Sequence, residues 1–121
     1  MSGALWGVQI VLTVLFLIAG TMKLLRSKEQ LAPKMAWVED HSDGVIRAIG
    51  GAEVLGAAGL LLPDLLDTLA WATPLAAVCL AVLMLGAAWT HVSRKEQGQA
   101  FVPVALALLA GFVAYGRLMA T

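Results

Sequence analysis

Residues 5–25 read LWGVQIVLTVLFLIAGTMKLL, an apolar run whose only charge, Lys23, stands near its end. A helix rises about 1.5 Å per residue, so about 20 apolar residues are enough to cross the core of a bilayer. The run is too long for the apolar part of a signal peptide, and no Lys or Arg precedes it. The stretch therefore predicts a retained transmembrane helix from about Ala4 to Leu25.

The rest of the chain has the same character. Of its 121 residues, 60% are apolar and only 13% are charged, about half the charged share of a soluble domain. Three further apolar runs predict spans at about 45–62, 68–91 and 100–118. Pro63 is expected to end the second span, and Pro74 either to kink the third or to mark its true start. The sequence predicts an all-α integral membrane protein, a single domain over 1–121 folded as a four-helix bundle, with the lipid bilayer as its solvent.

The basic residues suggest how the bundle is oriented. Seven of them stand at the helix ends joined by the first and third loops: Lys23, Arg26, Lys28, Lys34, Arg47, Arg94 and Lys95. Cytoplasmic loops carry such an excess, so both loops are expected in the cytoplasm and both termini on the outer, periplasmic side of a bacterial inner membrane. In the long loop, residues 26–44, Leu31, Met35 and Val38 recur at helical spacing. That spacing predicts a short helix on the inner membrane surface, with an irregular polar connector as the alternative.

Glu53 is the most informative ionisable residue, because it lies well inside the second apolar run. A carboxylate at that depth costs at least about 2–3 kcal/mol unless it is paired, hydrated or protonated. It is therefore expected to face the interior of the bundle. Two interpretations remain open, a carboxylate that handles protons or binds a ligand, and a structural carboxylate in a buried ion pair.

Three other polar residues end or begin spans on the same side as the long loop. Lys23 and His91 close the first and third spans, and Arg47 opens the second. Each is a candidate to reach toward Glu53. For Lys23 and Arg47 the alternative is that their long side chains extend to the membrane surface. For His91 the alternatives are a histidine that titrates near neutral pH and an interfacial residue without a special role.

A second group of polar residues belongs to the opposite ends of the helices. Tyr115 and Arg117 close the fourth span, and Arg117 is expected to pair with Asp64 or Asp67 of the second loop. Gln9 lies deep enough in the first span to need a hydrogen-bond partner.

Several function classes are excluded by the sequence. Cys79 is the only cysteine, which excludes disulfide scaffolds, CxxC redox pairs and cysteine zinc sites. No metal site is predicted, and His41 in a loop and His91 at a helix end make a poor pair of haem ligands. The formal net charge is zero, so a nucleic-acid partner has no electrostatic support.

Four short motifs together resemble the DoxX-like family of small bacterial membrane proteins. They are FLIAGTMKL at residues 16–24, GGAEVLG at 50–56 continuing to LLLP at 60–63, MLGAAWTH at 84–91, and YGR at 115–117. The resemblance covers nearly the whole chain. It implies a four-helix membrane bundle and, through the subunit that gave the family its name, a link to thiosulfate oxidation with a quinone as acceptor. It also implies that the recurrent polar positions are Lys23, Glu53, His91 and Arg117.

Three functions are compatible with these observations. The preferred one is membrane redox chemistry on a quinone or other lipophilic substrate, with Glu53 and His91 as proton-exchanging catalytic groups. Its substrate-binding residues would be Lys23, Arg47, Gln9, Tyr115 and Arg117. The chain has no flavin or metal motif, so electrons would come from a partner. The alternatives are a small proton-coupled transporter centred on Glu53, and a scaffold that docks on a larger membrane complex. Faces rich in small residues suit docking to such a membrane protein partner and also suit a homodimer.

Overall fold

The structure, a computed structural model, describes residues 2–33 and 35–120; Lys34, counted above among the basic loop residues, lies outside them. Four long helices make up most of the chain: α1 (Ser2–Leu25), α3 (Asp43–Leu65), α4 (Ala72–Ser93) and α5 (Gln97–Ala120). All four are long and apolar enough to cross a membrane. The predicted all-α fold with four transmembrane helices is therefore confirmed, and a lipid bilayer is the environment of the chain.

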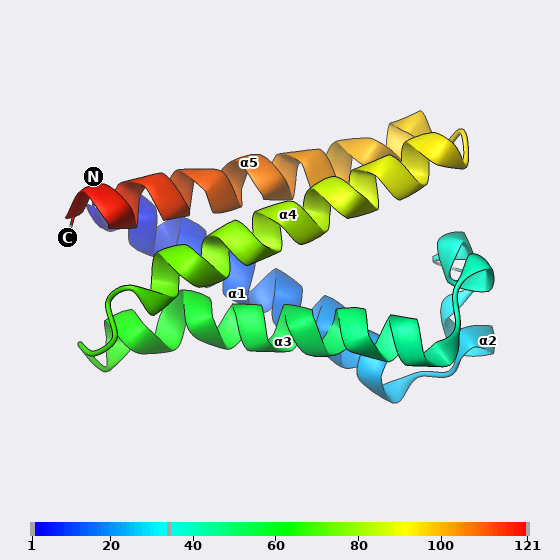
Figure 1. Ribbon diagram of the computed structural model, residues 1–121, viewed down its shortest axis with the longest axis horizontal. Coiled ribbons are helices and arrows are strands. Elements are labelled where there is room, and N and C mark those ends of the chain that lie inside the picture. The colour runs from blue at the N-terminus through cyan, green and yellow to red at the C-terminus, as the bar shows by residue number, and fades with distance from the viewer. Residues whose placement is uncertain (1, 34, 121) are drawn as a thin grey trace.

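The helices form two closely packed pairs, α1 with α3 and α4 with α5, and the pairs meet mainly where α3 packs on α4. Both termini lie at one end of the bundle, which we call the terminal end, and the connection between α1 and α3 lies at the other, the loop end (Figure 1). Helix α4 runs obliquely: it lies beside α3 at the terminal end and diverges from it toward the loop end (Figure 1). The two helix pairs consequently separate toward the loop end.

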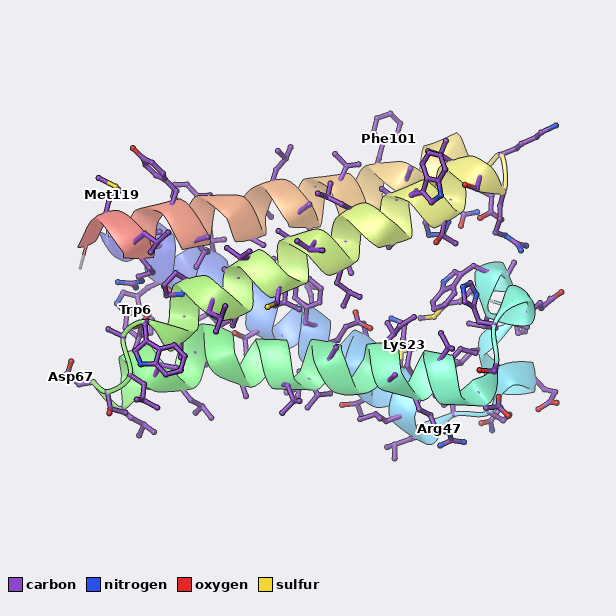
Figure 2. All side chains as sticks on the ribbon, viewed as in Figure 1. Trp6, Lys23, Arg47, Asp67, Phe101 and Met119 are labelled. Atoms are coloured by element: carbon purple, nitrogen blue, oxygen red, sulfur yellow. The ribbon has the colours of Figure 1, made fainter. Side chains whose placement is uncertain are left out.

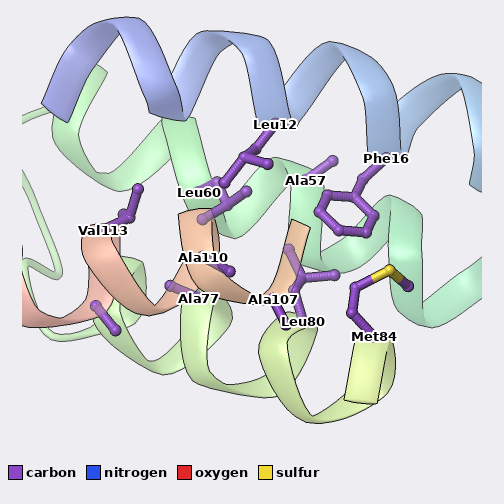
Figure 3. Packing of buried hydrophobic residues seen from close by; sticks show 11 residues of the cluster. Leu12, Phe16, Ala57, Leu60, Ala77, Leu80, Met84, Ala107, Ala110 and Val113 are labelled. Atoms are coloured by element: carbon purple, nitrogen blue, oxygen red, sulfur yellow. The ribbon is translucent and has the colours of Figure 1, made fainter. Parts of the chain in front are cut away.

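Eleven buried apolar residues hold the helices together, with contributions from all four (Figure 3). Leu12 and Phe16 of α1 and Leu80 of α4 are among its fully buried members. Five of the members are alanines, Ala57, Ala77, Ala107, Ala110 and Ala114. Because lipid tails are as apolar as leucine, membrane helices gain most from such close packing of small side chains. Large apolar residues such as Leu55, Trp89 and Phe101 are exposed on the outside, where lipid covers them.

Two prolines define the helix ends differently from the sequence prediction. Pro63 was expected to end the second span at Leu62, but α3 continues to Leu65 with Pro63 inside it. A proline in the last turn removes only one hydrogen bond, which is too little to end a helix that is otherwise well packed. Helix α4 begins at Ala72, later than expected, and Pro74 lies in its first turn. Pro74 therefore marks the start of the helix, the second of the two possibilities given above.

The long loop contains two short helices, α2 (Lys28–Leu31) and the 3₁₀-helix η1 (Ala36–Asp40), in place of one surface helix. Pro33 stands between them, and it can neither donate a helical hydrogen bond nor let the preceding residue stay helical easily. The apolar side chains Leu31, Val38 and Ile46 are buried against one another in a small second core. Leu31 and Val38, whose spacing suggested a single surface helix, therefore pack inside the protein.

Helices α1 and α3 are in close backbone contact at two glycines. A Cβ atom on Gly20 would lie 2.6 Å from the carbonyl oxygen of Gly50, and one on Gly50 would lie 2.7 Å from the carbonyl oxygen of Gly20. Both distances are far below van der Waals contact, so only glycine fits at either position. Residues three apart share a helix face. The contact therefore brings Lys23 of α1 and Glu53 of α3 opposite each other.

Candidate ligand-binding site

A cavity of about 680 Å³ lies where the two helix pairs separate, and we call it the main cavity. Its walls come from α1 and α3 on one side, α4 and α5 on the other, and residues 35–41 of the long loop. Most of the lining is apolar, including Leu83, Val102 and Leu106. Charged or titratable side chains reach it from both helix pairs: Lys23 and Glu53 from one, His91 from the other.

Lys23 and Glu53 form an ion pair inside the bundle. The Nζ atom of Lys23 lies 2.6 Å from Oε1 of Glu53, and the side chains are only 8% and 2% exposed. Each charge compensates the other, which is what makes either tolerable at this depth. The structure thus supplies the ion-pair partner that the sequence left open for Glu53. Because both side chains also line the main cavity, the pair is placed to contact a molecule there.

Residues of the long loop line the cavity beside this ion pair. The ring of Trp37 lies 5.8 Å from Nζ of Lys23, within range of a cation–π interaction. His41 stands edge-on to the same ring with centroids 5.5 Å apart, and its Nδ1 atom lies 3.1 Å from the carbonyl oxygen of Trp37. The ammonium group is thereby held between a carboxylate and an aromatic face.

The opposite wall presents a histidine whose orientation is fixed by an acid. Nδ1 of His91 lies 2.9 Å from Oε1 of Glu96, and Arg94 donates to the second oxygen of that carboxylate. The hydrogen bond from His91, followed by the contact with Arg94, holds the pKa of Glu96 below its usual value. An anionic Glu96 accepts a hydrogen bond from the N–H of Nδ1, so Nε2 is the ring nitrogen that this contact does not use. His91 thus lines the main cavity with its Nδ1 atom already engaged by Glu96.

Gln9 and Arg117 belong to a different cluster at the terminal end. Gln9 donates to the carbonyl oxygen of Leu60 at 2.7 Å and to Oδ2 of Asp64 at 2.8 Å. Arg117 donates from Nε to Oε1 of Gln9 at 2.8 Å and lies 3.2 Å from Oδ2 of Asp64. Gln9 thus has the partners that its depth requires, and Arg117 pairs with Asp64, the first of its two expected partners. Neither residue lines the main cavity.

Arg47 and Tyr115, expected among the substrate-binding residues, lie away from the main cavity. Arg47 is exposed, donates to the carbonyl oxygen of Leu24 at 3.0 Å, and projects from the side of α3 opposite Lys23 (Figure 2). Arg47 lies six residues before Glu53 on α3. Six residues correspond to a rotation of about 600° around the helix axis, or roughly 240° once a full turn is subtracted, so the two side chains leave different faces of the helix. Tyr115 is 65% exposed on the outer face of α5. Its amphipathic ring suits the membrane interface instead.

The structure adds residues that the sequence reasoning missed. Trp37 and His41 reach the main cavity through the fold of the long loop, and no local pattern points to that. Glu96 had a usable signal: it follows His91 by five residues across a tight turn, in which Lys95 adopts a positive φ of 60°. Such a short turn brings an acidic side chain back to the C-terminal end of the preceding helix.

The site can now be compared with known proteins. The model of the DoxX-like family matches residues 7–113, a range that includes both helix pairs, the long loop and the three polar residues of the main cavity. No curated protein and no solved structure matches the chain. The match extends over most of the sequence and includes three of the four motifs, while YGR at 115–117 lies beyond it. The chain therefore belongs to the DoxX-like family of membrane proteins.

Proposed function

We propose that the main cavity binds a lipophilic small molecule with a polar, oxygen-bearing head, a quinone being the preferred candidate, as part of membrane redox chemistry. The observation that carries this proposal is a cavity of about 680 Å³, within membrane-spanning helices, that brings Lys23, Glu53 and His91 to one apolar space. Small-molecule sites typically occupy about 300–1,000 Å³ and combine apolar walls with a few placed polar groups. The main cavity has that size and that composition.

Each polar residue has a distinct task in this proposal. The ammonium group of Lys23 donates a hydrogen bond to one oxygen of the ligand head, and Glu53 holds that ammonium in place. His91 exchanges a proton with an oxygen of the head through Nε2, while Glu96 orients its ring. Apolar residues such as Val102 and Leu106 contact the hydrocarbon part. The electrons come from a partner, which we place among membrane or membrane-associated redox proteins.

The pairing of Glu53 favours this function over a proton-coupled transporter. A transporter of the single-carboxylate type alternates one acidic side chain between a proton and a cationic substrate. In this protein Lys23 already holds the cation position at 2.6 Å from Glu53. An incoming cation would have to displace a buried ammonium group and leave it unpaired, at a cost of about 3–5 kcal/mol. We therefore assign Glu53 and Lys23 to ligand binding.

The orientation in the membrane is part of the same proposal. The excess of Lys and Arg at the loop end supports a position of that end in the cytoplasm of a bacterial cell, with both termini on the outer side of the inner membrane. The polar part of the main cavity then lies in the cytoplasmic half of the bilayer.

Binding of a short-chain quinone to the purified, reconstituted protein tests the proposed function. Ala87 lines the main cavity, so Ala87→Trp should fill it and abolish saturable binding. His91→Gln should weaken binding about tenfold, the effect of losing one hydrogen bond to the ligand. Ala105→Trp is the matched control, because Ala105 is exposed on the outer face of α5. Equal affinities for wild type and Ala87→Trp would refute the proposed site.

A further inference from the structure

The main cavity has a mouth on the outer surface of the bundle, between α3 and α4. Val82 and Gly86 of α4 both line the cavity, and both are exposed. Val82 is 63% exposed and shares the outer face of α4 with Val78, one helical turn earlier, which is also exposed but does not line the cavity. Because Val82 belongs both to the outer face and to the cavity wall, it stands at the mouth.

The mouth follows from the divergence of α4 from α3 toward the loop end. Nearer the terminal end the two helices are in contact, since a Cβ atom on Gly56 would lie 2.6 Å from Cδ2 of Leu80. Ala87 lies two turns further along the same face of α4, but there it lines the cavity. In Figure 2, Lys23, which comes from α1, is visible between α3 and α4 with neither helix in front of it. The cavity therefore extends into the space between these two helices.

The mouth lies at the depth of the hydrocarbon core. Val82 is near the middle of α4 (Ala72–Ser93), and Glu53, on the opposite wall of the cavity, is near the middle of α3 (Asp43–Leu65). The central residues of a helix that crosses a bilayer lie in its hydrocarbon core, wherever the ends of the helix lie relative to the lipid heads. Lipid tails, and not water, are therefore the medium outside the mouth.

We propose that the ligand of the main cavity carries a long hydrocarbon tail, which leaves the cavity between α3 and α4 past Val82 and Gly86 and lies in the lipid. The proposal rests on the proposed function and narrows its ligand to long-chain compounds that stay dissolved in the membrane. The polar residues that would hold the head and the exposed mouth belong to one continuous cavity. Gly86 adds no side chain to the mouth, and a Cβ atom there would meet nothing within 4 Å. Outside the mouth, lipid surrounds the tail with groups as apolar as its own.

Two quinones with the same head, one with a short tail and one with a long alkyl tail, test the passage. Their equilibrium binding would be measured with radiolabelled compounds and protein reconstituted in bilayer discs of one lipid composition. Val82→Trp places a large side chain in the mouth and should weaken binding of the long-tailed compound about tenfold, because the tail loses its path. Binding of the short-tailed compound should change less than about twofold, which also shows that the variant is folded.

Val78→Trp is the matched control, because it makes the same change on the same face of α4 at a position that does not line the cavity. It should leave both affinities unchanged. Partition of each compound into the lipid is the same for all three proteins, so it cancels in the comparison. If Val82→Trp weakens binding of both compounds equally, or of neither, the tail does not pass Val82 and the proposal is overturned, while the proposed function stands. Failure of the wild type to bind the short-tailed compound would instead refute the proposed function itself.

Discussion

Glu53→Ala should destabilise the protein by about 3–5 kcal/mol, the largest effect that we expect from any single substitution. The reason is the Lys23 side chain, which is only 8% exposed and lies 2.6 Å from the carboxylate. Without Glu53, a buried ammonium group has no counter-charge, because the ring of Trp37 beside it carries none. The penalty is therefore that of an uncompensated charge inside a membrane helix bundle.

Unfolding of the protein in mixed micelles measures this effect. The double variant Lys23→Met, Glu53→Leu should recover most of the lost stability, since an apolar pair of similar volume replaces the charges. Arg47→Ala is the single-site control, because Arg47 is exposed on the same helix and should change stability by less than about 0.5 kcal/mol. If Glu53→Ala were as stable as Arg47→Ala, Glu53 would not be one half of a buried ion pair.

Gly20→Ala should cost about 1–3 kcal/mol, because the added methyl group meets the backbone of Gly50 as well as the side chain of Val54. Its Cβ would lie 2.6 Å from the carbonyl oxygen of Gly50, so α1 and α3 must move apart. The same movement lengthens the contact between Lys23 and Glu53. We therefore expect weaker ligand binding together with lower stability.

The matched control for this substitution is Gly51→Ala. Gly51 lies next to Gly50 on α3, but a Cβ there would have no neighbour within 4 Å. Alanine is the better helix former by about 1 kcal/mol, so this variant should be as stable as the wild type or more stable. Thermal unfolding of the two variants compares them directly, and equal stabilities would contradict the close approach of α1 and α3 at the two glycines.

The membrane fold was predictable because it depends on composition and length alone. Runs such as residues 5–25 can satisfy their backbone in lipid only as helices. Glu53 was predictable as an interior residue for the same reason, since a charge in such a run must be compensated. Helical geometry would also have removed Arg47 from the site, because six positions turn it away from Glu53. That conclusion needs only the geometry of an α-helix and not the tertiary structure.

The main cavity was not predictable from the sequence. It exists because α4 diverges from α3 toward the loop end and because the long loop folds back with Leu31 and Val38 buried. Both features depend on contacts between distant parts of the chain. Trp37, which lies over Lys23 in the structure, belongs to a loop for which the sequence suggested only a surface helix or a connector. The choice of Lys23 as the partner of Glu53 likewise depends on how Gly20 packs on Gly50.

The central claim is that the main cavity holds a lipophilic ligand, and its most direct test is to identify what the cavity contains. The wild type, Ala87→Trp and Ala105→Trp would be purified in native lipid and every bound small molecule identified by mass spectrometry. We expect a quinone or other lipophilic compound with the wild type and Ala105→Trp, and its loss from Ala87→Trp. Ordinary membrane lipid alone in all three samples would contradict the claim and leave Lys23 and Glu53 with a structural role.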